Sequence, residues 1–333
     1  MRQQYTACLP MRLILVFLYL SFICCAQMPV IFDTDMGNDV DDALALAMLH
    51  SLTSRGECRL LGVTLTNANA SAVPYVRLVN AFYGRRELPV GTALKAIPGG
   101  AKDGYLSATL KGAPESLALA ARATSREEDA VSLLRRLLAE STQKLTIIQV
   151  GFSTTLAALL DSQPDRFSPL AGEELVRKKV ALVSAMAGNF TGGPPEYNVK
   201  LDVPAARTVF DRWPTPVIFS GFEIGRELLF PAARIEHDFR YVPWHPIATS
   251  YRAYNKMPYD RPTWDLTAVL AAVRADHGYF SFSPKGRVRV AEDGGTTFEA
   301  GPGDRQFLRL EAGNKGRILE ALTLLASEPP ASR

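Results

Sequence analysis

Short apolar runs rich in β-branched residues alternate with helical segments along most of this chain. The runs that read as buried strands are Pro29–Phe32, Arg59–Thr66, Leu145–Val150, Lys179–Ser184 and Pro216–Phe219. The segments with helical spacing are Asp41–His50, Val73–Tyr83, Asp129–Glu140, Pro204–Phe210 and Thr263–Ala275. Strands and helices in alternation predict an α/β fold with a doubly wound, mostly parallel sheet.

The pattern changes after about Asp276. Three short strands joined by Gly-rich turns are predicted at Arg287–Val290, Thr296–Glu299 and Phe307–Leu310. They indicate a small antiparallel appendage, which one closing helix, Lys315–Ser327, follows. The Gly-, Lys- and Ser-rich stretch Gly99–Gly112 is typical of a mobile loop at the functional edge of the sheet. Because no repeat or low-complexity linker interrupts residues 27–333, we expect a single domain there.

The N-terminus has the pattern of a signal peptide. Arg2 and Arg12 precede the apolar run Leu13–Ile23, and small residues follow at Cys24–Ala26. The run is too short to cross a bilayer core of roughly 30 Å. We therefore expect residues 1–26 to be cleaved, which predicts a periplasmic or secreted protein without a stable membrane anchor. A lipid-anchored form through one of the leader cysteines is a weaker alternative, because neither has a small residue other than cysteine before it.

The cysteine content and the net charge narrow the kind of site to expect. Only Cys58 lies outside the leader, so the mature chain cannot form an internal disulfide. Without a second cysteine or clustered histidines there is no zinc motif, and a bound metal would need oxygen ligands. The net charge of +3 is small and its basic residues are scattered, which argues against a nucleic-acid partner. The sequence therefore favours a small-molecule site.

Five aspartates follow the first predicted strand within ten residues: Asp33, Asp35, Asp39, Asp41 and Asp42. In open α/β sheets, ligands bind beyond the carboxyl ends of the strands, which is where this cluster lies. Carboxylates about 4 Å apart repel each other by several kcal/mol, and a hard divalent cation such as Ca²⁺ or Mg²⁺ would relieve the repulsion. Capping of a solvent-facing helix could account for one or two of the last three aspartates, but not for all five.

Five segments, in order, resemble the inosine-uridine-preferring nucleoside hydrolase family. They are Asp33–Leu44, Gly62–Asn69, Thr146–Gly151, Met186–Gly188 together with Glu196–Asn198, and Trp264–Asp265. The commonest form of the family lacks two of the residues between Gly37 and Asp42, which leaves the role of Asp39 open. The resemblance implies a Rossmann-like fold, a nucleoside substrate, hydrolysis of its N-glycosidic bond and a homo-oligomer, either a dimer or a tetramer.

The resemblance also implies a role for each matched residue. Asp35 would be the general base, and Ca²⁺ would be held by Asp35, Asp42, Asp265 and the backbone carbonyl of Val150. The ribose would be bound by Asp41, Asn69, Met186, Glu196 and Asn198, with Asp33 as a supporting residue. Each has a simpler alternative when taken alone: Asn69 as a turn residue, Met186 as core, Glu196 and Asn198 as loop residues, and Asp265 as a helix cap.

Trp264 stands where many members of the family have a histidine that is proposed to protonate the leaving base. A purine-preferring branch has tryptophan there, and its stacking on the base is thought to raise the basicity of the base. The resemblance therefore implies that Trp264 is a catalytic residue and that purine nucleosides are preferred, with a buried aromatic as the alternative. Tyr251, Arg252 and Tyr254 could cover the base, or they could face solvent or a neighbouring subunit. Three histidines, His237, His245 and His277, belong to no motif and are expected to be structural.

Three competing functions remain. A haloacid dehalogenase-like phosphatase would use Asp33 as nucleophile with Mg²⁺, but no acidic pair follows Lys178 and Lys179 as that family requires. A non-catalytic periplasmic ribose- or nucleoside-binding protein would keep the ribose contacts without needing Asp35. A hydrolase of another N-riboside is the third, because the part of the site that surrounds the base is the most variable in the family.

Overall fold

The computed structural model describes residues 27–94, 97–98, 100, 102–122 and 128–331. The predicted signal peptide, residues 1–26, lies outside the described residues, and the single domain over residues 27–333 stays a prediction. Within the described part of the chain, no helix is long and apolar enough to cross a membrane.

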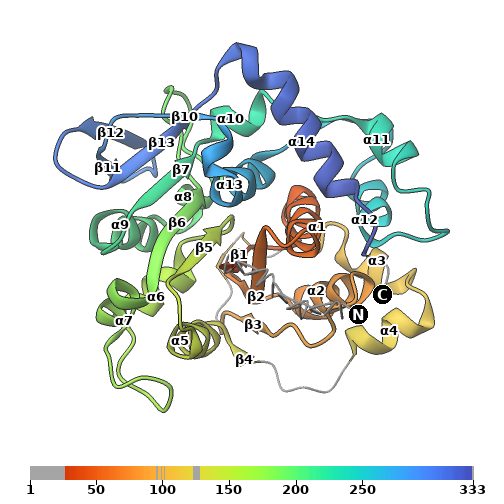
Figure 1. Ribbon diagram of the computed structural model, residues 1–333, viewed down its shortest axis with the longest axis horizontal. Helices are drawn as coiled ribbons and strands as arrows, with labels where there is room; N and C mark the ends of the chain where they lie inside the picture. Colours follow the sequence, from red (N-terminus) through yellow and green to blue (C-terminus); the bar gives the residue numbers. More distant parts are fainter. Residues whose placement is uncertain (1–26, 95–96, 99, 101, 123–127, 332–333) are drawn as a thin grey trace, which may run out of the picture.

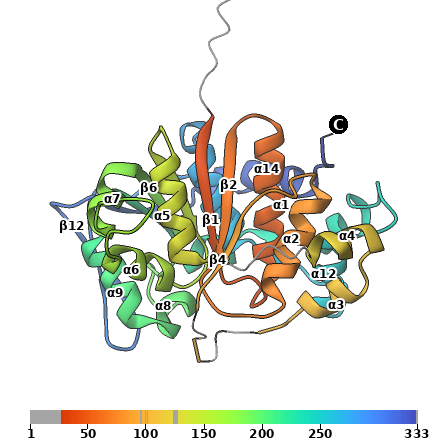
Figure 2. The ribbon, with the colours of Figure 1, turned by 90° about the horizontal axis from the view of Figure 1, so that it is seen from below.

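A mostly parallel sheet runs through the middle of the molecule (Figures 1 and 2). Its strands, in spatial order, are β12 (Thr296–Ala300), β11 (Gly286–Val290), β13 (Arg305–Arg309), β7 (Val217–Ser220), β6 (Val180–Met186), β5 (Leu145–Gln149), β1 (Met28–Thr34), β2 (Cys58–Leu65), β3 (Val90–Thr92) and β4 (Glu128–Asp129). Strand β10 (Ser281–Phe282) pairs with β13, and β8 (Leu229–Phe230) forms a separate pair with β9 (Arg261–Pro262). The α/β, doubly wound fold predicted from the alternation is confirmed.

Helices cover both faces of this sheet (Figure 1). One side carries α1 (Asp41–Ser54), α2 (Ala72–Phe82), α12 (Pro246–Tyr254), α13 (Trp264–Val273) and α14 (Lys315–Ser327), and the other side carries α5 (Ala130–Glu140), α6 (Thr154–Asp161), α7 (Gly172–Lys179) and α9 (Val203–Arg212). The shorter helices are α3 (Leu106–Lys111), α4 (Glu115–Ala121), α8 (Tyr197–Leu201), α10 (Phe222–Arg226) and α11 (Ala232–His237), with 3₁₀ turns at Ala275–His277 and Ala312–Asn314.

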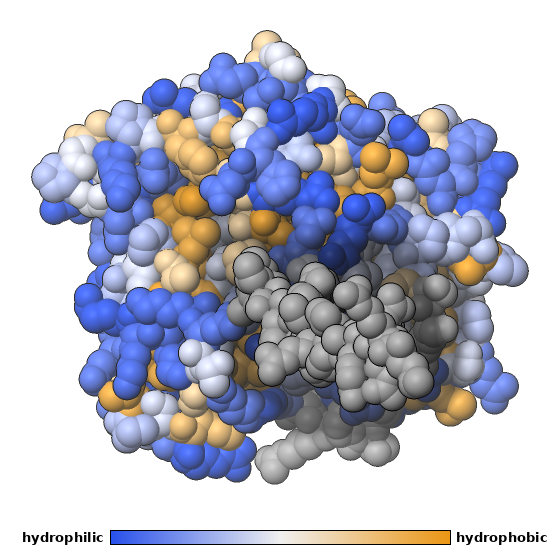
Figure 3. Space-filling view, in the orientation of Figure 1, coloured by the Kyte–Doolittle hydropathy of each residue, from blue (hydrophilic) through white to orange (hydrophobic). Residues whose placement is uncertain are grey.

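The alternation of side chains along β1 explains why there are two cores. Val30 and Phe32 point into the core shared with α1 and α13, whereas Ile31 points into the core shared with α5 and α6. Because β1 is central and covered on both faces, its sequence is a continuous apolar run rather than an alternating one. On the face seen in Figure 3, hydrophilic residues predominate along the periphery, and hydrophobic residues gather in patches between them.

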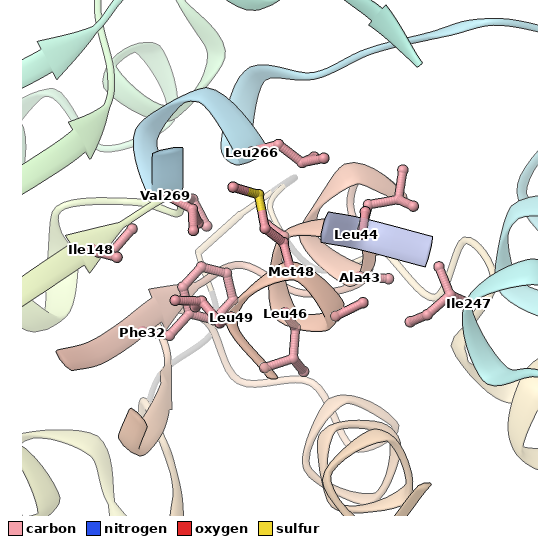
Figure 4. Close-up of a cluster of buried hydrophobic side chains, with 14 of the residues drawn as sticks. Phe32, Ala43, Leu44, Leu46, Met48, Leu49, Ile148, Ile247, Leu266 and Val269 are labelled. Atoms are coloured by element: carbon pink, nitrogen blue, oxygen red, sulfur yellow. The ribbon is translucent and has the colours of Figure 1, made fainter. Parts of the chain in front are cut away.

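Helix α1 is buried along nearly its whole length, from Asp41 to Leu52. Its apolar residues therefore point in all directions, which is the pattern of a helix enclosed by other elements rather than lying on a surface. In Figure 4, Met48 and Leu49 lie close to Phe32 of β1 and Val269 of α13. This packing holds the N-terminus of α1 firmly beside the end of β1.

The C-terminal strands extend the main sheet instead of forming a separate unit. Strands β11 and β12 are an antiparallel hairpin, as predicted. Strand β13, however, pairs in parallel with β7, with Phe307 opposite Phe219. The small antiparallel appendage is thus the edge of the central sheet.

The prediction of a mobile loop over Gly99–Gly112 is wrong for its second half. Residues 99 and 101 lie outside the description, but Leu106–Lys111 form α3. Tyr105 and Leu106 are fully buried, and Tyr105 packs edge-on against Tyr75 with ring centroids 5.3 Å apart. Burial of these two large side chains outweighs the loop-like composition around them.

Candidate active site

One cavity of about 180 Å³ opens beyond the carboxyl ends of β1, β5 and β6. It brings together these predicted residues: Asp35, Asp41, Asp42, Val150, Met186, Glu196, Asn198, Trp264 and Asp265. The rest of its lining is Asn38, Asp39, Lys102, Tyr197 and Phe222. These fourteen residues are called the active-site cavity below. Its position is the one that ligands occupy in open α/β sheets.

Asp33 lies beneath this cavity and supports it. The side chain has no exposed surface, and it accepts hydrogen bonds from Thr64 Oγ1 at 2.5 Å and Thr155 Oγ1 at 2.7 and 2.8 Å. Burial raises the pKa of Asp33 to about 7, although the two threonine bonds act against that rise. A buried carboxylate between two hydroxyls cannot attack a substrate, which removes the phosphatase alternative.

The turn from β1 to α1 depends on Gly37. Its φ is +113°, a conformation that glycine adopts much more readily than other residues. A Cβ added there would lie 2.7 Å from the carbonyl oxygen of Lys102 and 2.6 Å from the side chain of Leu106. This close approach brings Lys102 to the rim of the active-site cavity.

Asp35 and Asp42 face the cavity from the two ends of this turn. Asn38 Nδ2 donates to Asp35 Oδ2 at 2.6 Å, and Thr34 Oγ1 donates to Asp42 Oδ1. Burial raises the pKa of Asp35 to about 7. Burial, followed by the charges of Asp35 and Asp41, raises the pKa of Asp42 well above its usual value. The charged form of each group is therefore unfavourable unless positive charge lies nearby.

Asp41 and Asp265 join the N-termini of α1 and α13. The backbone N–H of Asp265 donates to Asp41 Oδ2 at 3.2 Å, while the buried Oδ1 of Asp41 has no hydrogen-bond partner among the described residues. Burial raises the pKa of Asp41 to about 7, and burial with the charge of Asp41 raises that of Asp265 well above its usual value. The two helix dipoles meet at this corner and favour negative charge there, but they cannot neutralise this many carboxylates.

The donor set fits a hard cation in its chemistry. Asp35, Asp42 and Asp265 supply carboxylate oxygens, and Val150 adds a backbone carbonyl on the same cavity, which is the ligand type that Ca²⁺ and Mg²⁺ prefer. Within the described residues, no three acidic or other metal-ligating side chains already form a closed cage. Asn38 bonds to Oδ2 of Asp35 and Thr34 bonds to Oδ1 of Asp42, so each carboxylate keeps its other oxygen for a cation.

The opposite wall is built from β5, β6 and the start of α8. Asn198 Nδ2 donates to the carbonyl oxygens of Val150 at 2.9 Å and Met186 at 3.2 Å. Glu196 caps α8, because its carboxylate accepts from the backbone N–H groups of Asn198 at 2.7 Å, Gly188 at 3.1 Å and Val199 at 3.2 Å. Burial raises the pKa of Glu196 to about 7 against the effect of these bonds.

Met186 and Asn69 turn out differently from each other. Met186 belongs to the core, as its simpler alternative stated, and it also lines the cavity, while its contact with the ribose stays a prediction. Asn69 does not line the cavity. Its Oδ1 accepts from the N–H of Ser71 at 3.0 Å, and its Nδ2 donates to the carbonyl of Lys102 at 2.8 Å. It is a turn residue that tethers the rim, as its simpler alternative stated.

Trp264 already has close partners. Its Nε1 donates to the carbonyl oxygen of Phe222 at 2.9 Å, and the two rings stack with centroids 5.3 Å apart. The guanidinium of Arg261 lies 5.0 Å from the indole centroid. A base that stacks on Trp264 therefore has to share the ring with these neighbours.

Sequence reasoning missed Asn38, which lines the cavity, and Arg261, which lies behind the lining. Asn38 stood inside the acidic segment without a role, and Arg261 lies in the Pro-rich stretch Met257–Pro262, where no motif marked it. Of the residues considered as a cover for the base, Tyr251 is fully buried and Arg252 is exposed.

Tyr254 comes near the site, because its hydroxyl donates to Asp39 Oδ1. His245 is structural, as expected: it caps α12, accepting from the N–H of Ile247 at 3.2 Å. His277 lies outside the cavity and stacks on Tyr279, and His237 ends α11.

Comparison with known proteins identifies the family of this chain. The profile of the family described as inosine-uridine preferring nucleoside hydrolase matches residues 30–313. The chain is 30% identical over 230 residues to the pyrimidine-specific ribonucleoside hydrolase RihA of Salmonella enteritidis, which covers 67% of this chain and 68% of the relative.

Solved structures share the fold. An inosine-uridine preferring nucleoside hydrolase from Bacillus anthracis has a TM-score of 0.69 at 17% identity, and covers 90% of this chain and 99% of that one. A purine-preferring ribonucleoside hydrolase from Gardnerella vaginalis has a TM-score of 0.67 at 18% identity, with the same coverage. The family match over most of the chain shows that it belongs to the inosine-uridine preferring nucleoside hydrolase family, and that it is an enzyme that cleaves N-glycosidic bonds.

Proposed function

We propose that this chain hydrolyses ribonucleosides in a Ca²⁺-dependent reaction that gives ribose and the free base. The observation that carries the proposal is the convergence of Asp35, Asp42, Asp265 and the Val150 carbonyl on one cavity. Burial and mutual repulsion make these carboxylates costly to ionise without a cation, as their raised pKa values indicate. A single calcium ion held by these four groups would offset most of that charge and lower the pKa of a water molecule beside it.

Asp35 is the group that takes the proton from the attacking water. It lines the cavity, and its bond from Asn38 fixes the orientation of the carboxylate. A general base is most effective when its pKa lies near the working pH, and burial moves Asp35 towards that range. As the bond to the base lengthens, positive charge develops on the sugar, and the surrounding carboxylates stabilise it.

The ribose is held by groups on both sides of the cavity. Asp41 contributes its unpartnered Oδ1, and Asn198 contributes a carboxamide from the opposite wall. Glu196 lies beside Asn198, and by its cap bonds it also fixes the start of α8. Holding the sugar from two walls supplies the orientation on which the rate of such a reaction depends.

We propose a preference for purine bases on the basis of Trp264, whose large ring lines the cavity where the base would leave. A pyrimidine preference is the second candidate. It is favoured by the Salmonella relative, which is named pyrimidine-specific and is more similar in sequence than the purine-preferring structural neighbour. The contacts of Trp264 with Phe222 and Arg261 also limit its freedom to stack on a base.

One screen tests the activity, the metal and the base together. The mature chain is incubated with inosine, adenosine, uridine or cytidine, with Ca²⁺ or with a chelator, and base release is followed by chromatography. We expect release that the chelator abolishes, and a kcat/KM at least about tenfold higher for the purine nucleosides. Full activity after complete metal removal would refute the metal assignment. A higher kcat/KM for uridine would refute the purine preference, and a lack of release from all four nucleosides would favour the alternative of another N-riboside.

We also infer export, on the basis of residues 1–26, and a homodimer or homotetramer in the periplasm or medium. Cell fractionation with the full-length chain tests the first inference. Size-exclusion chromatography with light scattering tests the second, for which a monomer at micromolar concentration is the contrary result.

A further inference from the structure

The guanidinium of Arg261, in β9, lies against two aromatic rings and two carboxylates. Its Cζ is 5.0 Å from the ring centroid of Tyr254 and 5.0 Å from that of Trp264. One Nη lies 2.5 Å from Asp39 Oδ1, and Nε lies 3.8 Å from Asp41 Oδ1. The side chain is only 16% exposed. A planar cation on aromatic faces and beside carboxylates has a defined orientation, unlike a cation in a surface ion pair.

Arg261 completes the surroundings of Asp41. Oδ2 of Asp41 accepts from the N–H of Asp265, but Oδ1 is buried without a hydrogen-bond partner. Arg261 Nε is also buried without one, and it faces that oxygen. At 3.8 Å the two atoms are too far apart for a hydrogen bond, but their opposite charges attract each other. Rotation of the Asp41 carboxylate away from Arg261 therefore costs electrostatic energy. Arg261 thereby keeps Oδ1 oriented for the sugar.

The same guanidinium fixes the ring of Trp264. Phe222 stacks on the indole and accepts its N–H, which sets the plane of the ring. Arg261 adds a cation–π contact to that ring. One side chain therefore connects the residue proposed for the ribose, Asp41, with the residue proposed for the base.

Asp39 and Tyr254 hold Arg261 in this place. Asp39 pairs with the guanidinium and also accepts from the hydroxyl of Tyr254. Asp39 belongs to the part of the acidic segment, between Gly37 and Asp42, that is longer here than in the commonest form of the family. This gives the extra aspartate a function that the sequence alone left open.

We propose that Arg261 is a positioning residue that sets Asp41 and Trp264 relative to each other, and that Asp39 anchors it. The inference rests on the proposed nucleoside hydrolase function and deepens it. Arg261 does not line the cavity, so it acts through its neighbours and is not a catalytic residue.

The experiment compares the wild type with Arg261→Met, Arg261→Lys, Asp39→Asn and the double variant of Arg261→Met and Asp39→Asn. Arg252→Met is the matched control, because Arg252 is an exposed arginine on α12 that lies outside the cavity and donates to the carbonyl of Ile235. Steady-state kcat and KM are measured with the best nucleoside, and binding of D-ribose is measured by calorimetry. Circular dichroism and thermal melting check that each variant folds.

We expect Arg261→Met to lower kcat/KM about 100-fold, with part of the loss in KM, and to weaken ribose binding about tenfold. Arg261→Lys, which keeps the charge but loses the planar fork, lies between it and the wild type. Asp39→Asn lowers kcat/KM about tenfold alone but less than about twofold when Arg261 is already methionine, because the two residues act as a unit. Arg252→Met leaves all values unchanged.

Two results would overturn the inference: Arg261→Met with kcat, KM and ribose affinity within about threefold of the wild type, or additive effects of Asp39→Asn and Arg261→Met. If the wild type releases no base, the proposed function fails, and the ribose titration still decides the role of Arg261. In that case, unchanged ribose binding by a folded Arg261→Met variant would sink the inference as well.

Discussion

At the scale of single residues, the cavity combines groups that share a charge but differ in their surroundings. Asp33 is enclosed by two threonine hydroxyls, whereas Asp35 accepts one bond from Asn38 and lines the cavity. They are two residues apart in sequence, but Asp33 lies within β1, whereas Asp35 follows the end of the strand, where the chain turns towards α1. This difference separates a supporting carboxylate from one that can reach water.

Asp35→Asn tests this separation of roles. Asparagine keeps the size of the side chain but cannot accept a proton, so we expect kcat to fall at least about 1000-fold while the fold is retained. Asp276→Asn, at an exposed carboxylate outside the cavity, is the control and should behave as wild type. Base release is the measurement. A variant that keeps activity within about tenfold of the wild type would instead favour a base other than Asp35.

The sequence patterns predicted most of the residues that line this cavity, but not those that lie behind the lining. Asp35, Glu196 and Asp265 stood in ordered segments that a family resemblance could mark, and the structure brings them together. Arg261 carried no such mark, since its importance arises from contacts with residues that are distant in sequence. Asn69 stood in a matching segment, but the turn it forms directs its side chain to Lys102 instead of the cavity.

At the scale of elements, the site depends on how β1 is joined to its neighbours. Asp33 connects β1 with β2 through Thr64 and with α6 through Thr155. A buried carboxylate that loses a hydrogen-bond donor keeps the cost of its desolvation without the compensating bond. The three elements are thus held together at the floor of the cavity by one side chain.

Thr155→Val removes two of these contacts while keeping the shape of the side chain. We expect the free energy of unfolding to fall by about 1–3 kcal/mol, because Asp33 then keeps only Thr64 as a side-chain donor. Thr208→Val on α9 is the control, since the hydroxyl of Thr208 bonds only to the carbonyl of Pro204 on its own helix. Denaturant unfolding gives both values. Equal stability of the two variants would contradict the supporting role of Asp33.

An element could be predicted when the sequence pattern that favours it lies within its own residues. The apolar run of β1 and the helical spacing of α1 are local patterns, and both elements form where they were expected. Helix α3 was missed because its stabilising contacts, such as that of Tyr105 with Tyr75, come from another part of the chain. The parallel pairing of β13 with β7 is likewise decided by the whole sheet and not by its own five residues.

At the scale of the whole molecule, the acidic site affects stability as well as catalysis. Burial raises the pKa values of Asp33, Asp35 and Asp41 from 3.8 to about 7, and those of Asp42 and Asp265 also lie above their usual range. The folded protein without metal therefore binds protons more tightly than the unfolded chain. The resulting stabilisation is complete below about pH 4 and is lost as the pH rises through about 7.

We therefore expect the metal-free protein to melt at a lower temperature at pH 8 than at pH 5, by roughly 5 °C or more. In the proposed assignment Ca²⁺ binds the ionised carboxylates, so we expect it to raise the melting temperature at pH 8 much more than at pH 5. Melting curves in chelator and in excess Ca²⁺ at both pH values provide the measurement. A metal-free protein that is more stable at pH 8, or a Ca²⁺ effect independent of pH, would contradict this account.

The enclosure of α1 has a consequence for which ions the enzyme can accept. Asp42 sits on the first turn of a helix packed on all sides, and Asp265 sits on the first turn of α13, which packs against it. Neither helix can slide towards a smaller ion without disturbing the core. Hydrophobic packing therefore fixes the distance between these two carboxylates. To coordinate a smaller ion such as Mg²⁺ in the proposed metal site, Asp35 would have to move towards it on its turn, because the other two carboxylates stay in place.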